Sequence, residues 1–268
     1  MKKICIITGG SSGMGVCFAQ QLLHFREFDE MWLIARRIEK LQEVSDKLNE
    51  SIKINNSSVK IRCIQGDLSG KDGVEFVKNL LKEEKLHQDF IIDTLVNNAG
   101  YGTYGTFENT SLERQLGMVD LNVYSLTGIC YEALPFLTKG SLIINVASLA
   151  SFAPLGNFAV YGATKAYVYS FSLALAAELE PKGIFVETLC PGPVDTEFAN
   201  VASLGARKVV KDGKSPDKVV AHCLKSISRR KYISIMALKW KFKAFMSRFI
   251  SKIWFARYTF KHEKRPSN

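Results

Sequence analysis

Short, almost continuously apolar runs alternate with longer amphipathic runs along most of the chain. The apolar runs are rich in Ile, Val and Leu, which is typical of strands buried on both faces of a parallel sheet. They predict strands at 2–8, 31–36, 59–65, 93–98, 141–148, 184–190 and 231–236. Helical spacing of apolar residues predicts helices at 14–24, 37–51, 70–86, 111–137, 158–180 and 216–228. Because parallel strands need crossover connections, this alternation predicts an α/β fold with helices on both faces of a parallel sheet.

The apolar pattern changes after residue 237. From there, aromatic and aliphatic residues recur at helical i, i+3 and i+4 intervals, with Lys and Arg largely on the opposite side. The apolar positions are Phe242, Phe245, Met246, Phe249, Ile250 and Ile253. We therefore expect two parts in the chain, an α/β domain over 1–236 and a basic amphipathic C-terminal helix and tail over 237–268.

Charge is distributed unevenly along the 268 residues, which carry a formal net charge of +10. Residues 205–268 contain 18 Lys and Arg but 3 Asp and Glu, so the rest of the chain is slightly acidic. Aromatic residues on one helix face and cations on the other favour contact of 238–262 with an anionic membrane surface. The same helix could instead pack over a substrate site or against a second subunit. Since no nucleic-acid-binding motif accompanies the basic residues, we expect no nucleic-acid partner.

Cysteine and histidine content excludes several classes of protein. The six cysteines are far apart and form no C-x-x-C pair, which is typical of free thiols in a reducing compartment. The four histidines form no cluster with them, so no metal site is expected. The apolar start of the chain is too short for a signal peptide, and no stretch approaches the 18 apolar residues of a membrane span. We expect a cytoplasmic protein that is not secreted and has at most a peripheral membrane contact.

A glycine-rich turn, TGGSSGMG at 8–15, separates the first predicted strand from the first predicted helix. Glycines let the backbone turn sharply and approach a pyrophosphate, and the N–H groups at a helix N-terminus favour an anion. The motif therefore predicts a dinucleotide site. Its candidate residues are Gly9, Ser11, Ser12, Gly13, Met14 and Gly15.

The second predicted strand ends in LIARR at 33–37, where NAD-binding proteins place an acidic residue on the ribose 2′-hydroxyl. This chain has Ala35, Arg36 and Arg37 there instead. A guanidinium pairs well with a 2′-phosphate, so Arg36 indicates NADP(H) as the cofactor. Arg37 could equally begin a solvated helix.

With these motifs the chain resembles the short-chain dehydrogenase/reductase family over roughly residues 3–200. In the family's order and spacing, the motifs are TGGSSGMG, Asp67-Leu68, NNAG at 97–100, Asn122, Ser148, Tyr161-x3-Lys165 and Pro191-Gly192 with Thr196. The resemblance implies a doubly wound Rossmann-type sheet of about seven strands and a substrate loop at about 191–215. It implies further cofactor contacts from Asp67, Leu68, Asn98, Ala99, Gly100, Tyr161, Lys165, Pro191, Gly192, Val194 and Thr196.

Tyr161 and Lys165 lie four residues apart within a predicted helix, so their side chains share one face. Reduction of a carbonyl needs an acid, and a nearby ammonium is expected to lower the pKa of a tyrosine toward neutrality. Taken alone, the lysine could simply pack along the ring. The resemblance assigns Tyr161 as the acid and Lys165 as its partner, Ser148 as the residue that holds the substrate oxygen, and Asn122 as the residue that holds a relay water.

The segment between Ser148 and Tyr161 carries aromatic and aliphatic residues without charge, including Phe152 and Phe158. Such a wall suits an apolar ketone or secondary alcohol, and loose resemblance to hydroxysteroid and 3-oxoacyl reductases favours a steroid-like or 3-oxoacyl substrate. The same aromatic residues could belong to the core or to a subunit interface.

An alternative function is an NADPH-binding membrane adaptor with vestigial catalysis. The family pairs subunits through helices that correspond to 111–137 and 158–180, so a homodimer or homotetramer is expected.

Overall fold

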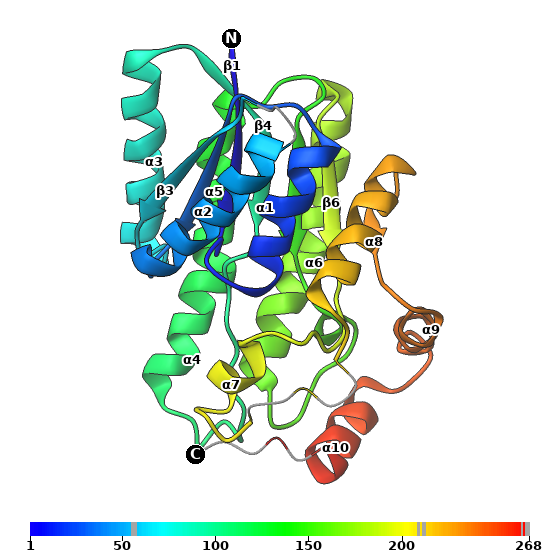
Figure 1. Cartoon of the computed structure of the whole chain (residues 1–268). Helices are drawn as coiled ribbons and strands as arrows, with labels where there is room; N and C mark the ends of the chain where they lie inside the picture. Colours follow the sequence, from blue (N-terminus) through cyan, green and yellow to red (C-terminus); the bar gives the residue numbers. More distant parts are fainter. Residues whose placement is uncertain (55–57, 208–209, 211–212, 264, 266–268) are drawn as a thin grey trace.

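We analysed a computed structural model of the chain, which describes residues 1–54, 58–207, 210, 213–263 and 265. Figure 1 shows a central sheet between layers of helices, with the shorter helices gathered at the end where the strands terminate. Within the described residues, no helix combines the length and the apolar character needed to cross a membrane.

A seven-stranded sheet forms the centre of the molecule, with strand order β3-β2-β1-β4-β5-β6-β7 and parallel pairing throughout. The strands are β1 (Lys2–Thr8), β2 (Glu30–Ala35), β3 (Lys60–Gln65), β4 (Phe90–Asn97), β5 (Leu142–Val146), β6 (Phe185–Leu189) and β7 (Ile233–Ser234). The predicted sheet is thereby confirmed, although β7 is shorter than expected because this edge strand pairs with β6 at two residues. The order reverses between β1 and β4, where α/β sheets bind their ligands.

Helices cover both faces of the sheet. On one face, α1 (Gly13–Phe25), α2 (Ile38–Ile54) and α8 (Pro216–Ser228) bury residues such as Phe18, Leu41 and Val220 against the strands. On the other face, α3 (Gly70–His87), α5 (Leu126–Ala133) and α6 (Ala159–Leu179) bury residues such as Leu81 and Val168. The two separate apolar cores explain why most strand positions are hydrophobic.

The predicted helix over 111–137 is interrupted. It begins as α4 (Leu112–Val119), widens into a π-helical turn (Asp120–Ser125), continues as α5 and ends in a 3-10 turn (Leu134–Phe136). The Ser125 hydroxyl donates to the carbonyl of Asp120 at 2.7 Å, which fits a turn one residue wider than an α-helical one. Such turns often occur at functional sites, and this one contains Asn122.

The expectation of a single C-terminal helix is wrong. The segment folds as two helices, α9 (Leu238–Met246) and α10 (Lys252–His262). The break has a local cause: the Ser247 hydroxyl donates to the carbonyl of Ala244, and Lys252 Nζ donates to the carbonyls of Ser247 and Phe152. A cation at the C-terminal end of α9 satisfies a carbonyl left free there, so the chain turns instead of continuing.

Candidate active site

A cavity of about 1380 Å³ lies at the carboxyl ends of the strands, on the side where α7 (Phe198–Ala202), α9 and α10 gather (Figure 1). Nearly all residues predicted for cofactor, substrate and catalysis line it, although they come from separate parts of the chain. The exceptions are Gly15 and Asn122, which are buried directly behind its wall. Residues 208–209 and 211–212 of the predicted substrate loop lie outside the described residues.

The glycine-rich turn has a backbone that requires glycine. Gly9 and Gly13 have φ of +68° and +55°, and a Cβ atom on Gly15 would lie 2.2 Å from the carbonyl oxygen of Gly9. Ser12 is the N-cap of α1, but its side chain makes no capping hydrogen bond. The N–H groups of the first helical turn are therefore free to meet an anion in the cavity.

The arginine corner of the cavity differs from the prediction in one respect. Arg36 lines the cavity as expected, but it is Arg37 that donates to the serines of the glycine turn, to Ser12 Oγ at 3.1 Å and to Ser11 Oγ at 3.5 Å. Glu197 pairs with Arg37 at 2.9 Å and with Lys40 at 2.9 Å. The spacing of the sequence could not separate the two neighbouring arginines, because only the turn into α2 decides which one faces the serines.

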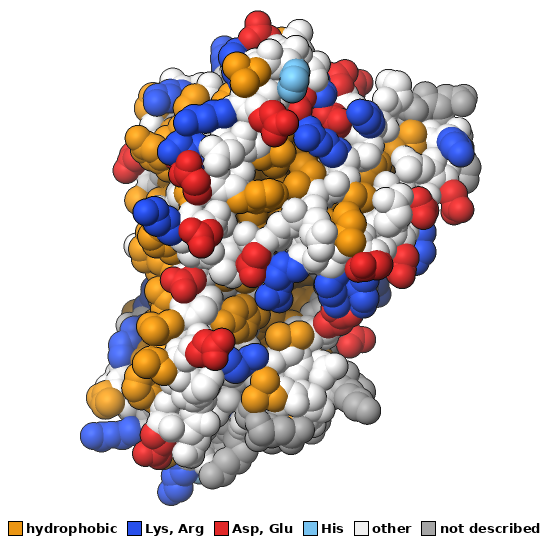
Figure 2. All heavy atoms as spheres, turned by 90° about the vertical axis from the view of Figure 1, so that its left-hand side faces the viewer, with side chains coloured by type: hydrophobic (Ala, Val, Ile, Leu, Met, Phe, Trp, Pro, Cys, Tyr) orange, Lys and Arg blue, Asp and Glu red, His pale blue; other side chains and the backbone are white. Residues whose placement is uncertain are grey.

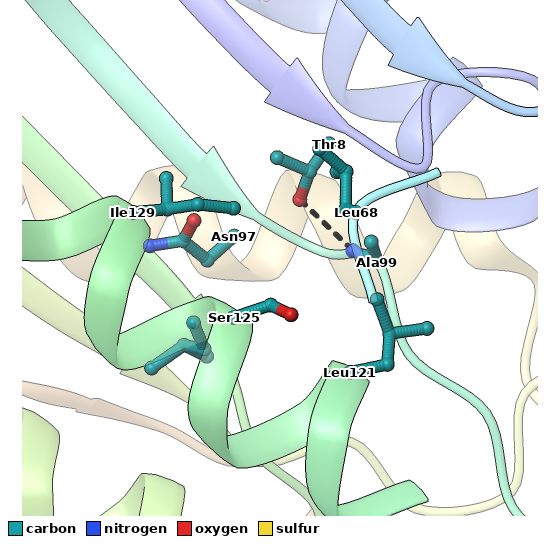
Figure 3. A pocket seen from close by; sticks show the side chains of 8 residues that line it. Thr8, Leu68, Asn97, Ala99, Leu121, Ser125 and Ile129 are labelled. Carbon is teal, nitrogen blue, oxygen red and sulfur yellow. Dashed lines mark hydrogen bonds between the residues drawn. The ribbon is translucent and has the colours of Figure 1, made fainter. Parts of the chain in front are cut away.

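The junction of β1 and β4 forms the floor of the cofactor side. Thr8 Oγ1 accepts hydrogen bonds from the backbone N–H groups of Asn98 and Ala99, both at 3.0 Å, and Asn98 Nδ2 donates to the carbonyls of Thr8 and Gly9. Figure 3 shows the bond between Thr8 and Ala99 above a small cavity of about 10 Å³ that Asn97 and Ser125 also line. These hydrogen bonds fix the start of the NNAG segment to the end of β1 and to the glycine turn.

Ser148, Tyr161 and Lys165 meet on the opposite wall. Ser148 follows β5 and accepts from the backbone N–H of Ala150 at 3.1 Å, which fixes its hydroxyl beside Tyr161. Tyr161 and Lys165 project from the first turns of α6, and Lys165 Nζ lies 5.9 Å from the centroid of the Tyr161 ring. Lys165 Nζ also donates to the carbonyl of Val146 at 2.7 Å. The three side chains therefore form one cluster, as the motif spacing predicted.

The predicted lowering of the Tyr161 pKa is wrong. Burial raises the pKa of Tyr161 well above its usual value, and the hydrogen bond with Ser148 opposes only part of this rise. Burial also lowers the pKa of Lys165 to about 8. Desolvation of the phenolate outweighs the nearby charges, so Tyr161 holds its proton at neutral pH.

Asn122 is fully buried, and protein groups engage its side-chain amide. Its Oδ1 accepts from the N–H of Tyr101 at 3.1 Å, while its Nδ2 donates to the carbonyl of Tyr101 at 2.9 Å and to Thr164 Oγ1 at 3.1 Å. These contacts tie the π-helical turn to the segment after β4 and to α6. The role of Asn122 in holding a relay water stays a prediction.

Aromatic rings surround Tyr161 on the substrate side. Phe158 stacks on the Tyr161 ring with a centroid distance of 4.2 Å, Tyr104 meets Phe158 edge-on at 4.8 Å, and Phe198 lies 5.4 Å from Tyr161. Phe152 also lines the cavity and packs against Tyr169. Phe158 is thus both a core residue and part of the cavity wall.

The C-terminal segment packs on the protein and completes the cavity. Met246 and Ile250, expected on an apolar membrane-facing side, line the cavity together with Trp240 and Arg265. The indole Nε1 of Trp240 is buried without a hydrogen-bond partner among the described residues, close to Gly192. This position agrees with the alternative that the C-terminal segment packs over a substrate site. The sequence did not single out Trp240, Arg265 or Arg207, because no local motif marks a residue that reaches a site from a distant segment.

The residues present fit an NADP-type dinucleotide. The uncapped N-terminus of α1 suits a pyrophosphate, and the guanidinium groups of Arg36 and Arg37 with the hydroxyls of Ser11 and Ser12 suit a ribose 2′-phosphate. Trp240 Nε1, a donor without a partner among the described residues, lies beside Gly192 on the cavity wall and is available to a bound ligand. The fold and the site together define a dinucleotide-dependent oxidoreductase with a Ser-Tyr-Lys cluster.

Comparison with known proteins agrees with this class. The family model of the short chain dehydrogenases matches residues 3–206. An "uncharacterized oxidoreductase" of Staphylococcus epidermidis is 29% identical over 221 residues, which are 82% of this chain and 90% of the relative. The very-long-chain 3-oxoacyl-CoA reductase of Rattus norvegicus is 31% identical over 229 residues, 83% of this chain and 67% of the relative. A short-chain dehydrogenase from Sphingobium yanoikuyae, solved in complex with NADPH, superposes with a TM-score of 0.76 at 27% identity, covering 93% of this chain and 94% of that one.

This chain belongs to the short chain dehydrogenase family. It is an oxidoreductase of the kind that interconverts alcohol and carbonyl groups with a nicotinamide dinucleotide.

Proposed function

We propose that the protein is an NADP(H)-dependent reductase that transfers a hydride between the nicotinamide and a ketone or secondary alcohol with an apolar body, such as a steroid-like or 3-oxoacyl compound. The observation that carries this proposal is the shared cavity: Ser148, Tyr161 and Lys165 line the same space as the glycine turn and the arginine corner. A dinucleotide and a carbonyl compound would meet there.

The preference for NADP(H) rests on the charges around the second strand. No carboxylate follows β2 at positions 35–37, and Arg37 is held against Ser12 at the cavity wall. Glu197 now serves as the anionic partner of Arg37 and Lys40, and a ribose 2′-phosphate could take its place. The relative from Sphingobium yanoikuyae, whose structure contains NADPH, supports the same preference.

The chemistry of the site follows from the protonation of its residues. When bound, the reduced nicotinamide supplies the hydride. Tyr161 keeps its proton because burial raises its pKa, so its hydroxyl can donate to the carbonyl oxygen and release the proton as negative charge develops there. Ser148 can donate to the same oxygen. The ammonium of Lys165 stabilises the tyrosinate that remains, and Asn122 would hold the relay water that returns a proton.

An apolar substrate body is favoured by the cavity wall. The rings of Phe152 and Phe158 line it with Leu155 and Ile250, and apolar walls of this kind bind apolar groups by removing them from water. The very-long-chain 3-oxoacyl-CoA reductase among the relatives fits a substrate of this class.

The test is Tyr161→Phe. We expect the variant to bind NADPH as the wild type does, measured by fluorescence titration, and to lose at least 10³-fold in turnover of hydrophobic ketones, measured by NADPH oxidation. Tyr232→Phe, which removes a hydroxyl that donates to Glu180 away from the cavity, is the matched control and should keep full activity. If Tyr161→Phe retains wild-type turnover, or if the wild type binds NADPH but turns over no ketone, an adaptor function would be favoured instead.

We also propose that the protein is a homo-oligomer that assembles through α4, α5 and α6. Apolar side chains are exposed on these helices, including Leu112 (64%), Leu116 (54%) and Tyr131 (71%). Figure 2 views the side of the molecule on which α3 and α4 lie, and hydrophobic side chains are visible there between charged ones. Sedimentation velocity should give a dimer or tetramer for the wild type and a smaller species for Leu116→Glu.

Contact with an anionic membrane surface is a further part of the proposal. The turn between α9 and α10 exposes Phe249 (70%) beside Arg248, and the start of α10 exposes Trp254 (55%) and Lys252. Such a combination binds anionic lipid headgroups through the cations and buries the rings at the interface. The protein should sediment with phosphatidylserine-containing vesicles and not with pure phosphatidylcholine vesicles, and Trp254→Ser should weaken this binding.

A further inference from the structure

The C-terminal half of the cavity wall carries excess positive charge. Among the described residues after position 200, three cations line it, Arg207, Lys243 and Arg265, against one acid, Glu263. Arg207 and Arg265 lie on the substrate side, because they contact the aromatic rings around Tyr161. An entirely apolar substrate would offer no anionic group to pair with these cations.

Arg265 is held in place by the segment that precedes the catalytic helix. Its Nη1 donates to the carbonyl of Gly156 at 3.0 Å, and its Nη2 pairs with Glu263 at 2.9 Å. The tail is anchored to the same segment by Thr259 Oγ1, which accepts from the N–H of Gly156 at 2.9 Å, and by Asn157 Nδ2, which donates to the carbonyl of Phe260 at 3.0 Å. The side chain of Arg265 is 15% exposed, so its position is defined by packing as well as by hydrogen bonds.

The guanidinium of Arg265 lies one aromatic ring away from the proton donor. It sits 5.0 Å from the centroid of Phe158, and Phe158 in turn stacks on Tyr161. Arg207 lies 6.0 Å from the centroid of Tyr104, which contacts the same Phe158 ring. A substrate with its carbonyl at Tyr161 could therefore reach both guanidinium groups with a second polar group.

The two arginines also affect each other. Burial lowers the pKa of Arg265, and the like charge of Arg207 lowers it further. Placing two cations near each other in a partly buried wall is unfavourable unless an anion neutralises them. Glu263 supplies part of that neutralisation, but it is 49% exposed and engages one of the five N–H donors of the guanidinium.

We propose that Arg265, assisted by Arg207, binds an oxyanion of the substrate, so that the protein reduces carbonyl compounds with an apolar body and a carboxylate, sulfonate or phosphate group. The inference rests on the proposed function only in taking this cavity as the substrate site. Aromatic walls bind the apolar body, and the planar guanidinium suits an oxyanion better than an ammonium would.

The experiment measures binding, so that it does not depend on turnover. Octanoate, octyl phosphate and the uncharged 1-octanol are titrated into the full-length protein saturated with NADP by isothermal calorimetry. We expect at least one anion to bind ten or more times more tightly than octanol. Preference for octanoate identifies a carboxylate as the recognised group, and preference for octyl phosphate identifies a phosphate.

Three variants test the assignment. Arg265→Gln should remove the preference for the anion and leave octanol binding unchanged, whereas Glu263→Gln should strengthen anion binding because it removes the competing carboxylate. Arg257→Gln, on the exposed side of α10, is the matched control and should change neither. The proposal is overturned if octanol binds the wild type as tightly as both anions do, or if Arg265→Gln weakens all three ligands equally. If anions bind through Arg265 but none of the ketones tested supports NADPH oxidation, the reductase function is contradicted and the proposed anion site still holds.

Discussion

A buried glutamate in the central sheet should make the stability of this protein depend steeply on pH. Glu187 lies in β6 with no exposed surface, and neither carboxylate oxygen has a hydrogen-bond partner among the described residues. Burial raises its pKa from the ordinary 4.5 to about 9, and the neighbouring Ser226 opposes this rise without cancelling it. Glu187 is therefore neutral in the folded protein at pH 7 and ionised in the unfolded chain.

The sign and size of the effect follow from proton binding. Between pH 4.5 and about 9 the folded state holds one proton more than the unfolded state at this residue, so the free energy of unfolding falls as the pH rises. The slope is about 1.4 kcal/mol per pH unit, which amounts to roughly 3 kcal/mol between pH 5 and pH 7. Glu187→Gln keeps the shape of the protonated acid and cannot titrate, so it should remove this contribution.

Urea denaturation followed by circular dichroism at pH 5, 6 and 7 is the assay, at one fixed protein concentration. The difference in free energy of unfolding between Glu187→Gln and the wild type should grow by about 3 kcal/mol in favour of the variant between pH 5 and pH 7. Glu178→Gln, at an exposed position of α6, is the matched control and should show no such growth. A difference between Glu187→Gln and the wild type that stays constant across this range would refute the reasoning.

Three further predictions concern the cofactor side of the cavity. Glu197→Gln frees Arg37 from an ion pair, so NADPH should bind several-fold more tightly while NADH binding stays unchanged in fluorescence titrations; an equal gain for both would argue against a phosphate site at this corner. Gly15→Ala should weaken NADPH binding more than tenfold, because its Cβ would overlap a backbone carbonyl, whereas Gly162→Ala should be tolerated, since its nearest neighbours would lie 3.9 Å away. The pKa of Lys165, lowered to about 8, predicts that kcat/KM for NADPH falls as the pH rises through 8. Lys165→Arg should move this fall to higher pH, because a guanidinium stays charged there. An unchanged pH profile in the variant would assign the fall to another group.

Much of the fold could be predicted because the signals are local. Strands buried on both faces are visible as apolar runs, and crossover helices are visible by their spacing. The order of the strands and of the helices that cover the sheet therefore followed from the sequence, although α4 and α5 were expected as one helix and α7 was not expected. The prediction failed at the C-terminus, where an apolar rhythm continued across Ser247 and Ser251 but the helix did not. Hydrogen bonds from Ser247 and Lys252 end one helix and begin the next. The spacing of apolar residues cannot predict such bonds.

The cluster of Ser148, Tyr161 and Lys165 was predictable for a similar reason, as were most residues of the cofactor side. The particular residues that the C-terminal segment adds to the cavity were not. Tyr161 and Lys165 are joined by helical spacing, and Ser148 stands at the end of a predicted strand. The contacts of Trp240, Arg207 and Arg265 with the cavity depend on how α9, α10 and the loop after α7 pack. These three residues lie more than forty positions after Lys165. Long-range packing of this kind leaves no periodic signature in the chain.

The sequence by itself determined the parallel sheet, the glycine-rich turn and the pairing of Tyr161 with Lys165, because each depends on residues that are neighbours along a strand, a turn or a helix. The tertiary structure alone decided the chemical state of those residues and their surroundings. Burial set the direction of the Tyr161 pKa, and the turn into α2 placed Arg37 beside Ser12. The packing of the C-terminal tail brought Arg265 to the cavity wall near Phe158. Desolvation of a side chain, and the meeting of residues from distant segments, depend on the surrounding fold. The order of residues along the chain does not show either directly.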